Sequence, residues 1–249
     1  MIGPAVILTL AGPRHGGAAR PGGPLEDDPP SLTFRLGSAK PGLSDALVPA
    51  ERPDEGPAGD TPPEASQAPA ASSRPTIHWH RASSRGLPFA GTLADGTQLP
   101  VEGHDWVTWD PVTDSVPNEP HRLYGNEHTI RTIVSVIAAY RAAHPDAPRV
   151  LVGDISFRGG GPMDQHRSHQ NGLDVDVYYP RLDRALRAPL ATDQIDPRLA
   201  QDLLDRFVAA GAQMVFVGYS TGLRGPDGIV IPYPNHENHM HVRFPLPPG

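Results

Sequence analysis

Two short histidine clusters contain the residues of this chain that are best suited to chemistry. Five of the twelve histidines lie in these clusters, namely His166, His169, His236, His239 and His241. The first cluster leads directly into Asp174 and Asp176. Imidazole nitrogens together with one carboxylate are typical ligands of a catalytic zinc ion, which usually keeps three protein ligands and one open position. The chain has no cysteine, which argues against a closed, cysteine-rich structural zinc site.

Both motifs alternate with apolar residues in the manner of β-strands. Residues 173–177 place their two carboxylates on one face of a half-buried strand. Residues 239–244 alternate in the same way, and one face of that stretch carries His239, His241 and Arg243. Gly172 would allow a tight turn before the first strand. Two strands that direct acid and imidazole to the same side can meet over one ion, so we expect a zinc site on the face of a sheet.

Each motif has an ordinary interpretation when it occurs alone. A single histidine is more often solvated or packed in a core than bound to a metal, and an Asp-x-Asp pair is common on exposed strands. The combination of the motifs favours the metal site. The other histidines are assigned the ordinary role, and these are His15, His78, His80, His104, His121, His128 and His144.

The longer stretches around these motifs resemble a known family. Residues 160–176 and 235–244 look like the motifs of the penicillin-insensitive murein endopeptidases, which belong to the lysostaphin, D-alanyl-D-alanine peptidase and hedgehog superfamily. Leu99-Pro100 and the stretches 122–125 and 150–154 are also similar to that family. The resemblance therefore covers about residues 86–246.

The resemblance implies a role for each site residue. The zinc ligands would be His169, Asp176 and His241. His239 would act as a general base or stabilise the transition state, with help from His236. His166 matches a further family histidine that is sometimes assigned to a second metal, and it is an additional candidate ligand. No histidine lies between residues 170 and 235 to complete a second site, so we expect one ion.

Asp174 is expected on the same side of its strand as Asp176. From there it would hold a ligand imidazole in one tautomer, as carboxylates behind metal ligands do. A solvated acid close to the site is the other interpretation of Asp174. Aromatic residues would line a substrate groove or pack in the core, and these are Trp106, Trp109, Tyr178, Tyr179 and Tyr233.

The implied activity is hydrolysis of peptide cross-links in bacterial peptidoglycan, of the D-alanyl to diaminopimelyl type, by metal-activated water. A D,D- or L,D-carboxypeptidase of the same superfamily would share the metal site but act on a chain end. A non-catalytic domain that binds metal or cell wall is the third alternative. His236 and His239 favour an enzyme, because a purely structural metal site needs neither.

Composition divides the chain into three parts. Fourteen of the 31 prolines precede Thr76, and residues 12–75 have too few apolar side chains to form a core, so we expect a disordered linker there. The apolar run within residues 1–11 is too short to span a bilayer and resembles a clipped signal sequence. Residues 76–249 would form the zinc metallopeptidase domain. A cell-wall substrate implies export to the periplasm or cell envelope, without stable insertion in a membrane.

The remaining patterns predict an α+β fold. Helices are expected from Asn126 to about Ala143 and from Asp196 to about Ala210, with a strand at 149–152 and a buried strand at 214–217. We therefore expect a central antiparallel sheet with flanking helices, preceded by the disordered segment. The net charge of −7 argues against nucleic acid as a partner, because phosphate-binding surfaces are basic.

Overall fold

The computed structural model describes residues 75–247. The stretch 1–11 and all but the last residue of the 12–75 segment lie outside the described residues, so the signal sequence and the linker stay predictions. Within the described part, no helix is both long enough and apolar enough to cross a membrane.

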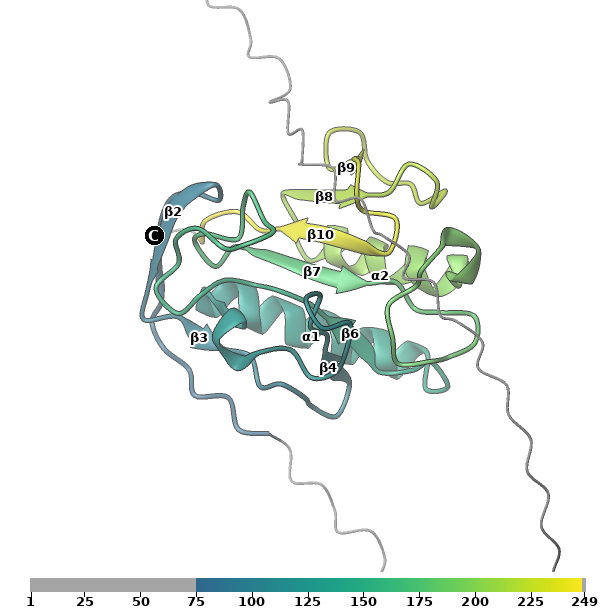
Figure 1. Cartoon of the computed structure of the whole chain (residues 1–249), viewed down its shortest axis with the longest axis horizontal. Helices are drawn as coiled ribbons and strands as arrows, with labels where there is room; N and C mark the ends of the chain where they lie inside the picture. Colours follow the sequence, from purple (N-terminus) through teal and green to yellow (C-terminus); the bar gives the residue numbers. More distant parts are fainter. Residues whose placement is uncertain (1–74, 248–249) are drawn as a thin grey trace, which may run out of the picture. The chain divides into compact units, whose positions relative to one another are not determined.

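A six-stranded sheet forms the centre of the domain (Figure 1). In spatial order its strands are β4 (Trp106–Thr108), β6 (Val150–Val152), β7 (Asp174–Tyr178), β10 (His239–Arg243), β8 (Met214–Val217) and β9 (Val230–Pro232). The three central pairings are antiparallel, whereas the outermost pairs, β4–β6 and β8–β9, are parallel. The expectation of an antiparallel sheet is therefore confirmed for the central strands and wrong for the two edge pairs, so the sheet is mixed.

The connections explain the parallel edges. Parallel neighbours need a long crossover, often a helix, whereas antiparallel neighbours can be joined by a tight turn. The chain between β4 and β6 includes the helix α1 (Glu127–Ala143), and a twelve-residue loop, 218–229, joins β8 to β9. Two small sheets and two short 3-10 helices complete the described part. They are formed by β1 (Ser83–Leu87) with β2 (Ala90–Ala94), β3 (Thr97–Gln98) with β5 (Tyr124–Gly125), η1 (Pro120–Arg122) and η2 (Thr192–Gln194).

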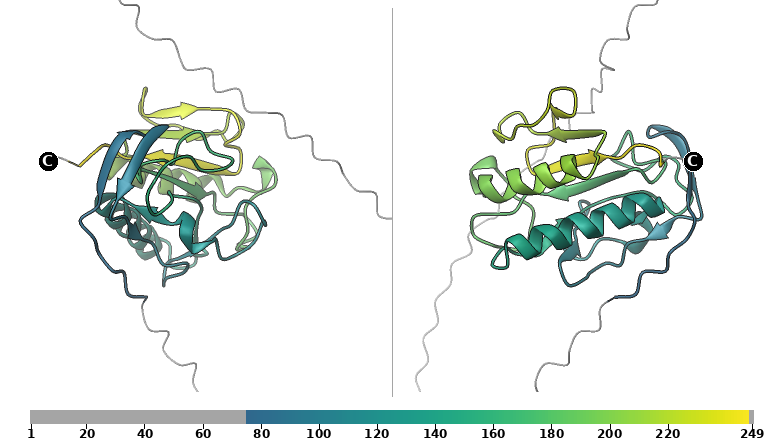
Figure 2. Two further views of the ribbon diagram at one scale, coloured as in Figure 1. Left: turned by 60° about the vertical axis from the view of Figure 1, so that its left-hand side comes forward. Right: turned by 180° about the vertical axis from the view of Figure 1, so that it is seen from behind.

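The two α-helices begin where their capping residues predict. The side chain of Asn126 accepts a hydrogen bond from the backbone N–H of His128 at the start of α1. Asp196 caps α2 (Pro197–Ala209), and Gly211 follows that helix with a φ of +89°, the left-handed conformation that favours glycine. Both helices cover the same face of the sheet (Figure 2), which gives an α+β arrangement.

Alternation along the strands separates the core from the opposite face. Val175 and Val177 of β7 and Met240 and Val242 of β10 are fully buried in the core that the helices form with the sheet. The helices contribute Ile133, Ile137, Leu203 and Phe207 to this core. Because neighbouring strand residues point to opposite sides, Asp174, Asp176 and His241 lie on the face away from the helices.

Two expectations about strand burial were wrong. β7 is buried along its whole length rather than half-buried, because chain segments also cover its polar face. β8 was expected to be fully buried, but only Val215 and Val217 are, while Met214 and Phe216 are partly exposed. Phe216 lies beside the histidines of the polar face, with its ring 5.6 Å from that of His241.

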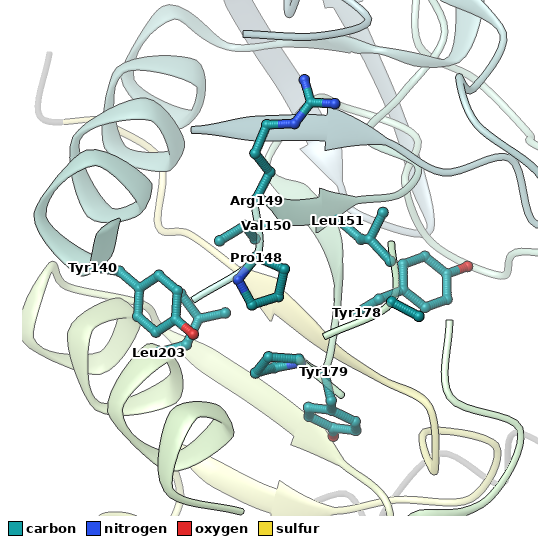
Figure 3. A pocket seen from close by; sticks show the side chains of 10 residues that line it. Tyr140, Pro148, Arg149, Val150, Leu151, Tyr178, Tyr179 and Leu203 are labelled. Carbon is teal, nitrogen blue, oxygen red and sulfur yellow. The ribbon is translucent and has the colours of Figure 1, made fainter. Parts of the chain in front are cut away.

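A small cavity lies between the helices and the end of β6 (Figure 3). Tyr140 and Leu203 of the two helices line it together with Pro148 and Tyr179. Its volume of about 10 Å³ is that of a single water site, and a water there would satisfy the buried hydroxyl of Tyr140, which has no protein partner. The cavity is too small for a substrate, so the candidate site must lie elsewhere.

Candidate metal centre

Strands β7 and β10 bring the acidic and histidine motifs together. They pair antiparallel, with His241 opposite Asp176 and Arg243 opposite Asp174. His239 lies opposite Tyr178 at the other end of the same ladder. The expectation that the two strands meet with their polar residues on one face is therefore confirmed by the register.

Three donor atoms converge at the centre of this face. His169 Nε2 lies 3.1 Å from His241 Nδ1 and 3.3 Å from Asp176 Oδ1, and the last two atoms are 3.1 Å apart. Zinc bonds of about 2.0–2.1 Å in a tetrahedron place neighbouring ligand atoms about 3.3 Å apart. The triangle formed by His169, Asp176 and His241 thus has the size of one face of a zinc coordination tetrahedron. We call these three residues the donor triangle.

The position of His169 is fixed by its backbone and by its second ring nitrogen. Its φ of +64° is unusual for a residue other than glycine, and Gly172, with a φ of +72°, completes the turn into β7. The Nδ1–H of His169 donates to the carbonyl oxygen of Ile155 at 3.0 Å. Because Nδ1 carries the proton in this arrangement, Nε2 presents its lone pair to the triangle.

Asp174 lies directly behind the triangle. It accepts two hydrogen bonds from the guanidinium of Arg243, at 2.7 and 3.1 Å, and one from the backbone N–H of His169 at 3.0 Å. Its Oδ1 is also 3.5 Å from His241 Nε2, an atom that is buried and otherwise has no partner. Asp174 is fully buried, so its interpretation as a solvated acid does not fit. Its contacts are those of a carboxylate that orients a ligand imidazole.

The two carboxylates beside His241 raise its pKa and so favour a proton on this residue of the donor triangle. Burial lowers the pKa of His241, but Asp174 and Asp176 outweigh that effect and raise the pKa to about 9. Burial lowers the pKa of His169. With this pKa, His241 is protonated at neutral pH in the metal-free protein, between two carboxylates, and a cation that bound there would displace the proton.

His166 lies beside the triangle rather than in it. Its Nδ1 is 3.8 Å from Asp176 Oδ2, the carboxylate oxygen that is not part of the triangle. His166, His169 and Asp176 together form a group whose ligand atoms all lie within 4.8 Å of one another. The Nε2–H of His166 donates to Asp154 Oδ2 at 2.8 Å. The structure thus places His166 as an additional donor next to the three residues named as ligands.

His239 and His236 stand on the other side of the triangle. His239 Nε2 is 3.8 Å from Asp176 Oδ1, and its Nδ1–H donates to the side-chain oxygen of Asn238 at 2.7 Å. The Nδ1–H of His236 donates to the carbonyl oxygen of Pro234, also at 2.7 Å. Burial lowers the pKa of His236 to about 3 and that of His239 to about 4. Both rings are therefore neutral at pH 7, each with an unprotonated Nε2.

The sequence around the first histidine cluster matches the model of one protein family. The family model described as penicillin-insensitive murein endopeptidase matches residues 84–210, about half of the chain. The chain belongs to this family. The matched range includes the first histidine cluster with Asp174 and Asp176, and it ends before β8 and the second cluster.

A curated member of the same family shows a similar likeness. The penicillin-insensitive murein endopeptidase of Haemophilus influenzae is 30% identical over 99 residues, which are 39% of this chain and 32% of that protein. The chain thus spans about a third of the length of this relative. The resemblance drawn from the motifs alone named the correct family.

A second set of polar residues near the donor triangle of this murein endopeptidase family member was not predicted from its sequence. Asp154 is fully buried at the end of β6 and contacts Arg122 and Asn118 as well as His166. The stretches 122–125 and 150–154 carried part of the family resemblance, but no role was assigned to them. The available clue was a Gly-Asp pair at the carboxyl end of a buried strand, where polar groups often approach a site.

The aromatic residues named as possible groove residues divide into two groups. Trp106 and Tyr179 are buried in the core under the helices. Tyr178 and Trp109 pack against each other on the polar face, with the Tyr178 ring 5.5 Å from that of His239. Tyr233 is partly exposed, and its ring lies 5.7 Å from that of His236. Aromatic rings thus flank His239 and His236, two of the three histidines of the second cluster.

Proposed function

We propose that this protein is a zinc-dependent murein endopeptidase that hydrolyses peptide cross-links of bacterial peptidoglycan, of the D-alanyl to diaminopimelyl type. The observation that carries the proposal is the donor triangle, together with two neutral histidines at its edge. A purely structural metal site would need neither His236 nor His239. Family membership supports the substrate class.

The donor set fits zinc in chemistry and in size. Two imidazole nitrogens and one carboxylate oxygen leave a fourth tetrahedral position open, which is the pattern of catalytic zinc sites. His169 would bind through Nε2, His241 through Nδ1 and Asp176 through Oδ1. A bound zinc ion would polarise the scissile carbonyl and lower the pKa of a coordinated water.

His239 is proposed as the general base. Its Nδ1–H is bound by Asn238, so its Nε2 lone pair is free to accept the proton of the attacking water. The Nε2–H formed in this way can then donate to the oxyanion or to the leaving amine. His236 has the same tautomer, and its ring centre lies 4.9 Å from that of His239. We assign it to orienting His239 and the oxyanion.

The proposed substrate implies a location and a partner. Peptidoglycan lies outside the cytoplasm, so the protein would have to be exported to the periplasm or cell envelope. The proposed partner is the cross-link peptide itself, without nucleic acid and without stable insertion in a membrane.

The test is digestion of purified peptidoglycan by the full chain, followed by mass spectrometry of the products. An endopeptidase converts cross-linked dimers into monomers, whereas a carboxypeptidase releases single terminal residues from uncross-linked stems. Treatment with a chelator should abolish hydrolysis, and added zinc should restore it. Intact dimers after digestion by the zinc-loaded protein would contradict the proposal.

Two histidine variants test the assignment of the base. His239→Ala should retain zinc and lose about 10²–10⁴-fold in turnover, the usual contribution of a positioned acid–base group. His144→Ala is the control, because His144 lies at the end of α1 and pairs with Asp202 at 2.9 Å, away from the triangle. If His239→Ala is zinc-replete and fully active, another residue is the base.

A further inference from the structure

The buried carboxylate of Asp154 has no part in the function proposed above, yet it is in contact with the metal centre. Its Oδ1 accepts hydrogen bonds from Arg122 Nε and Asn118 Nδ2, both at 2.8 Å. Its Oδ2 accepts from the Arg122 guanidinium at 2.6 Å and from His166 Nε2 at 2.8 Å. Four donors from three side chains therefore hold one carboxylate that is 0% exposed.

The partners of Asp154 are themselves fixed. The carbonyl oxygen of Arg122 accepts hydrogen bonds from the backbone N–H groups of Ile155 and Ser156. The backbone N–H of Asn118 donates to the hydroxyl of Thr108 on β4. The carboxylate is thus held by elements that belong to the sheet and its connections, and it can impose an orientation on a less constrained ring.

His166 is that ring. It lies in the loop between β6 and β7 and is partly exposed, and the only side-chain hydrogen bond assigned to it in the described structure is the one to Asp154. A carboxylate can only accept, so this bond places a proton on Nε2 of His166. In the neutral ring Nδ1 then has a lone pair, and this atom is the one that faces Asp176 Oδ2 at 3.8 Å.

A purely structural role explains the network less well. A buried ion pair such as Arg122 with Asp154 adds little net stability, because burying the two charges offsets most of their attraction. An ion pair with Arg122 also does not explain why Oδ2 of Asp154 accepts a second hydrogen bond, from the ring of His166 beside the metal ligands. Carboxylates behind metal-site histidines usually fix ring orientation and tautomer.

We propose that Asp154 is a positioning residue of the metal centre, which fixes His166 as the Nε2–H tautomer and so directs the lone pair of Nδ1 toward the donor triangle, as a third nitrogen beside those of His169 and His241. This inference rests on the metal centre of the proposed function. It assigns Arg122 and Asn118 to holding Asp154 in place.

The first test is the tautomer of His166 in the metal-free full chain. Long-range proton–nitrogen NMR spectra of the neutral ring, recorded at a pH above its observed titration and with His166 assigned by comparison with His166→Ala, should show a proton on Nε2 and none on Nδ1. A neutral ring with its proton on Nδ1 would overturn the proposal. This measurement needs neither zinc nor substrate.

The second test is a double-mutant cycle on zinc affinity, measured by competition with a chromophoric chelator. Asp154→Asn and His166→Ala should each weaken zinc binding by about 10–100-fold, the usual effect of losing such a partner. In the His166→Ala background, Asp154→Asn should have no further effect, because Asp154 acts through that ring. Independent, additive losses would refute the inference.

A matched variant separates positioning from damage to the fold. Asp196→Ala removes another buried carboxylate, the one that caps α2 and accepts hydrogen bonds from the backbone of that helix rather than from His166 or the partners of Asp154, so it should lower stability while zinc affinity changes less than threefold. If Asp154→Asn does not fold, the tautomer of the wild-type protein still decides the question. A wild-type protein that binds no zinc would instead refute the proposed function.

Discussion

Substituting Asp174 by asparagine would test the organisation of the whole centre. The carboxylate contacts the Arg243 guanidinium, the backbone N–H of His169 and, at 3.5 Å, the Nε2 of His241. All of these partners are donors. An asparagine side chain keeps one acceptor but turns an amide NH₂ toward at least one of them, and it removes the negative charge that faces His241.

The expected magnitudes follow from those contacts. Loss of the carboxylate behind a ligand histidine typically weakens metal binding about 10–100-fold, which corresponds to about 1.4–2.8 kcal/mol. The substitution also leaves the half-buried Arg243 guanidinium without its charged partner. Because water can still reach part of that group, we expect a loss of about 1–3 kcal/mol in the free energy of unfolding.

The assay is zinc affinity by chelator competition, with chemical unfolding of the same preparations. Asp183→Asn is the control, since Asp183 also binds an arginine in a two-point contact, with Arg181, but on an exposed loop. It should leave zinc affinity unchanged. If Asp174→Asn binds zinc within twofold of the wild-type protein, Asp174 does not orient the ligand, and our account of the centre is wrong.

Three further predictions follow from single features of the structure. Because the pKa of His241 is raised to about 9, this residue is protonated at pH 7. Zinc binding should then release about one proton, seen by calorimetry in buffers of different ionisation enthalpy, and affinity should fall as the pH is lowered from 9. Gly153→Ala would place a Cβ 3.0 Å from the Tyr178 ring and should destabilise the fold by about 1–3 kcal/mol in chemical unfolding. Tyr179→Phe removes the hydrogen bond from the phenol to the carbonyl oxygen of His236, and it should lower peptidoglycan turnover while zinc content, measured by elemental analysis, is retained.

The local features of the fold were predictable because they depend only on short stretches of sequence. Alternation within 173–177 and 239–244 gives the face of each side chain directly, since neighbouring strand residues point to opposite sides. Asn126 and Asp196 mark the helix starts because their side chains satisfy the first free N–H groups. These predictions require no knowledge of the distant parts of the chain.

Features that depend on distant parts of the chain were not predictable in this way. The alternation of a strand does not reveal which strand lies beside it, so the parallel pairs at the two edges of the sheet were missed. The register that sets His241 opposite Asp176 is likewise a property of two strands 65 residues apart. Asp154 reaches His166 only after β6 is inserted beside β7, and no spacing within either motif encodes that contact.

A sequence motif does not show which of its two ring nitrogens each histidine directs toward the site. In the structure, one nitrogen of every ring in the two clusters faces an oxygen, from Ile155, Pro234, Asn238, Asp154 or Asp174. His169, His236 and His239 therefore turn Nε2 to the centre, whereas His166 and His241 turn Nδ1. The two that use Nδ1 are the two whose Nε2 faces a buried aspartate. Carboxylate and carbonyl oxygens only accept hydrogen bonds, so the ring nitrogen that faces one of them carries the proton. The other nitrogen of a neutral ring then has the lone pair that a metal ion or a proton can bind. The five histidines define the chemistry that is available, and the residues behind them determine which atoms carry it out.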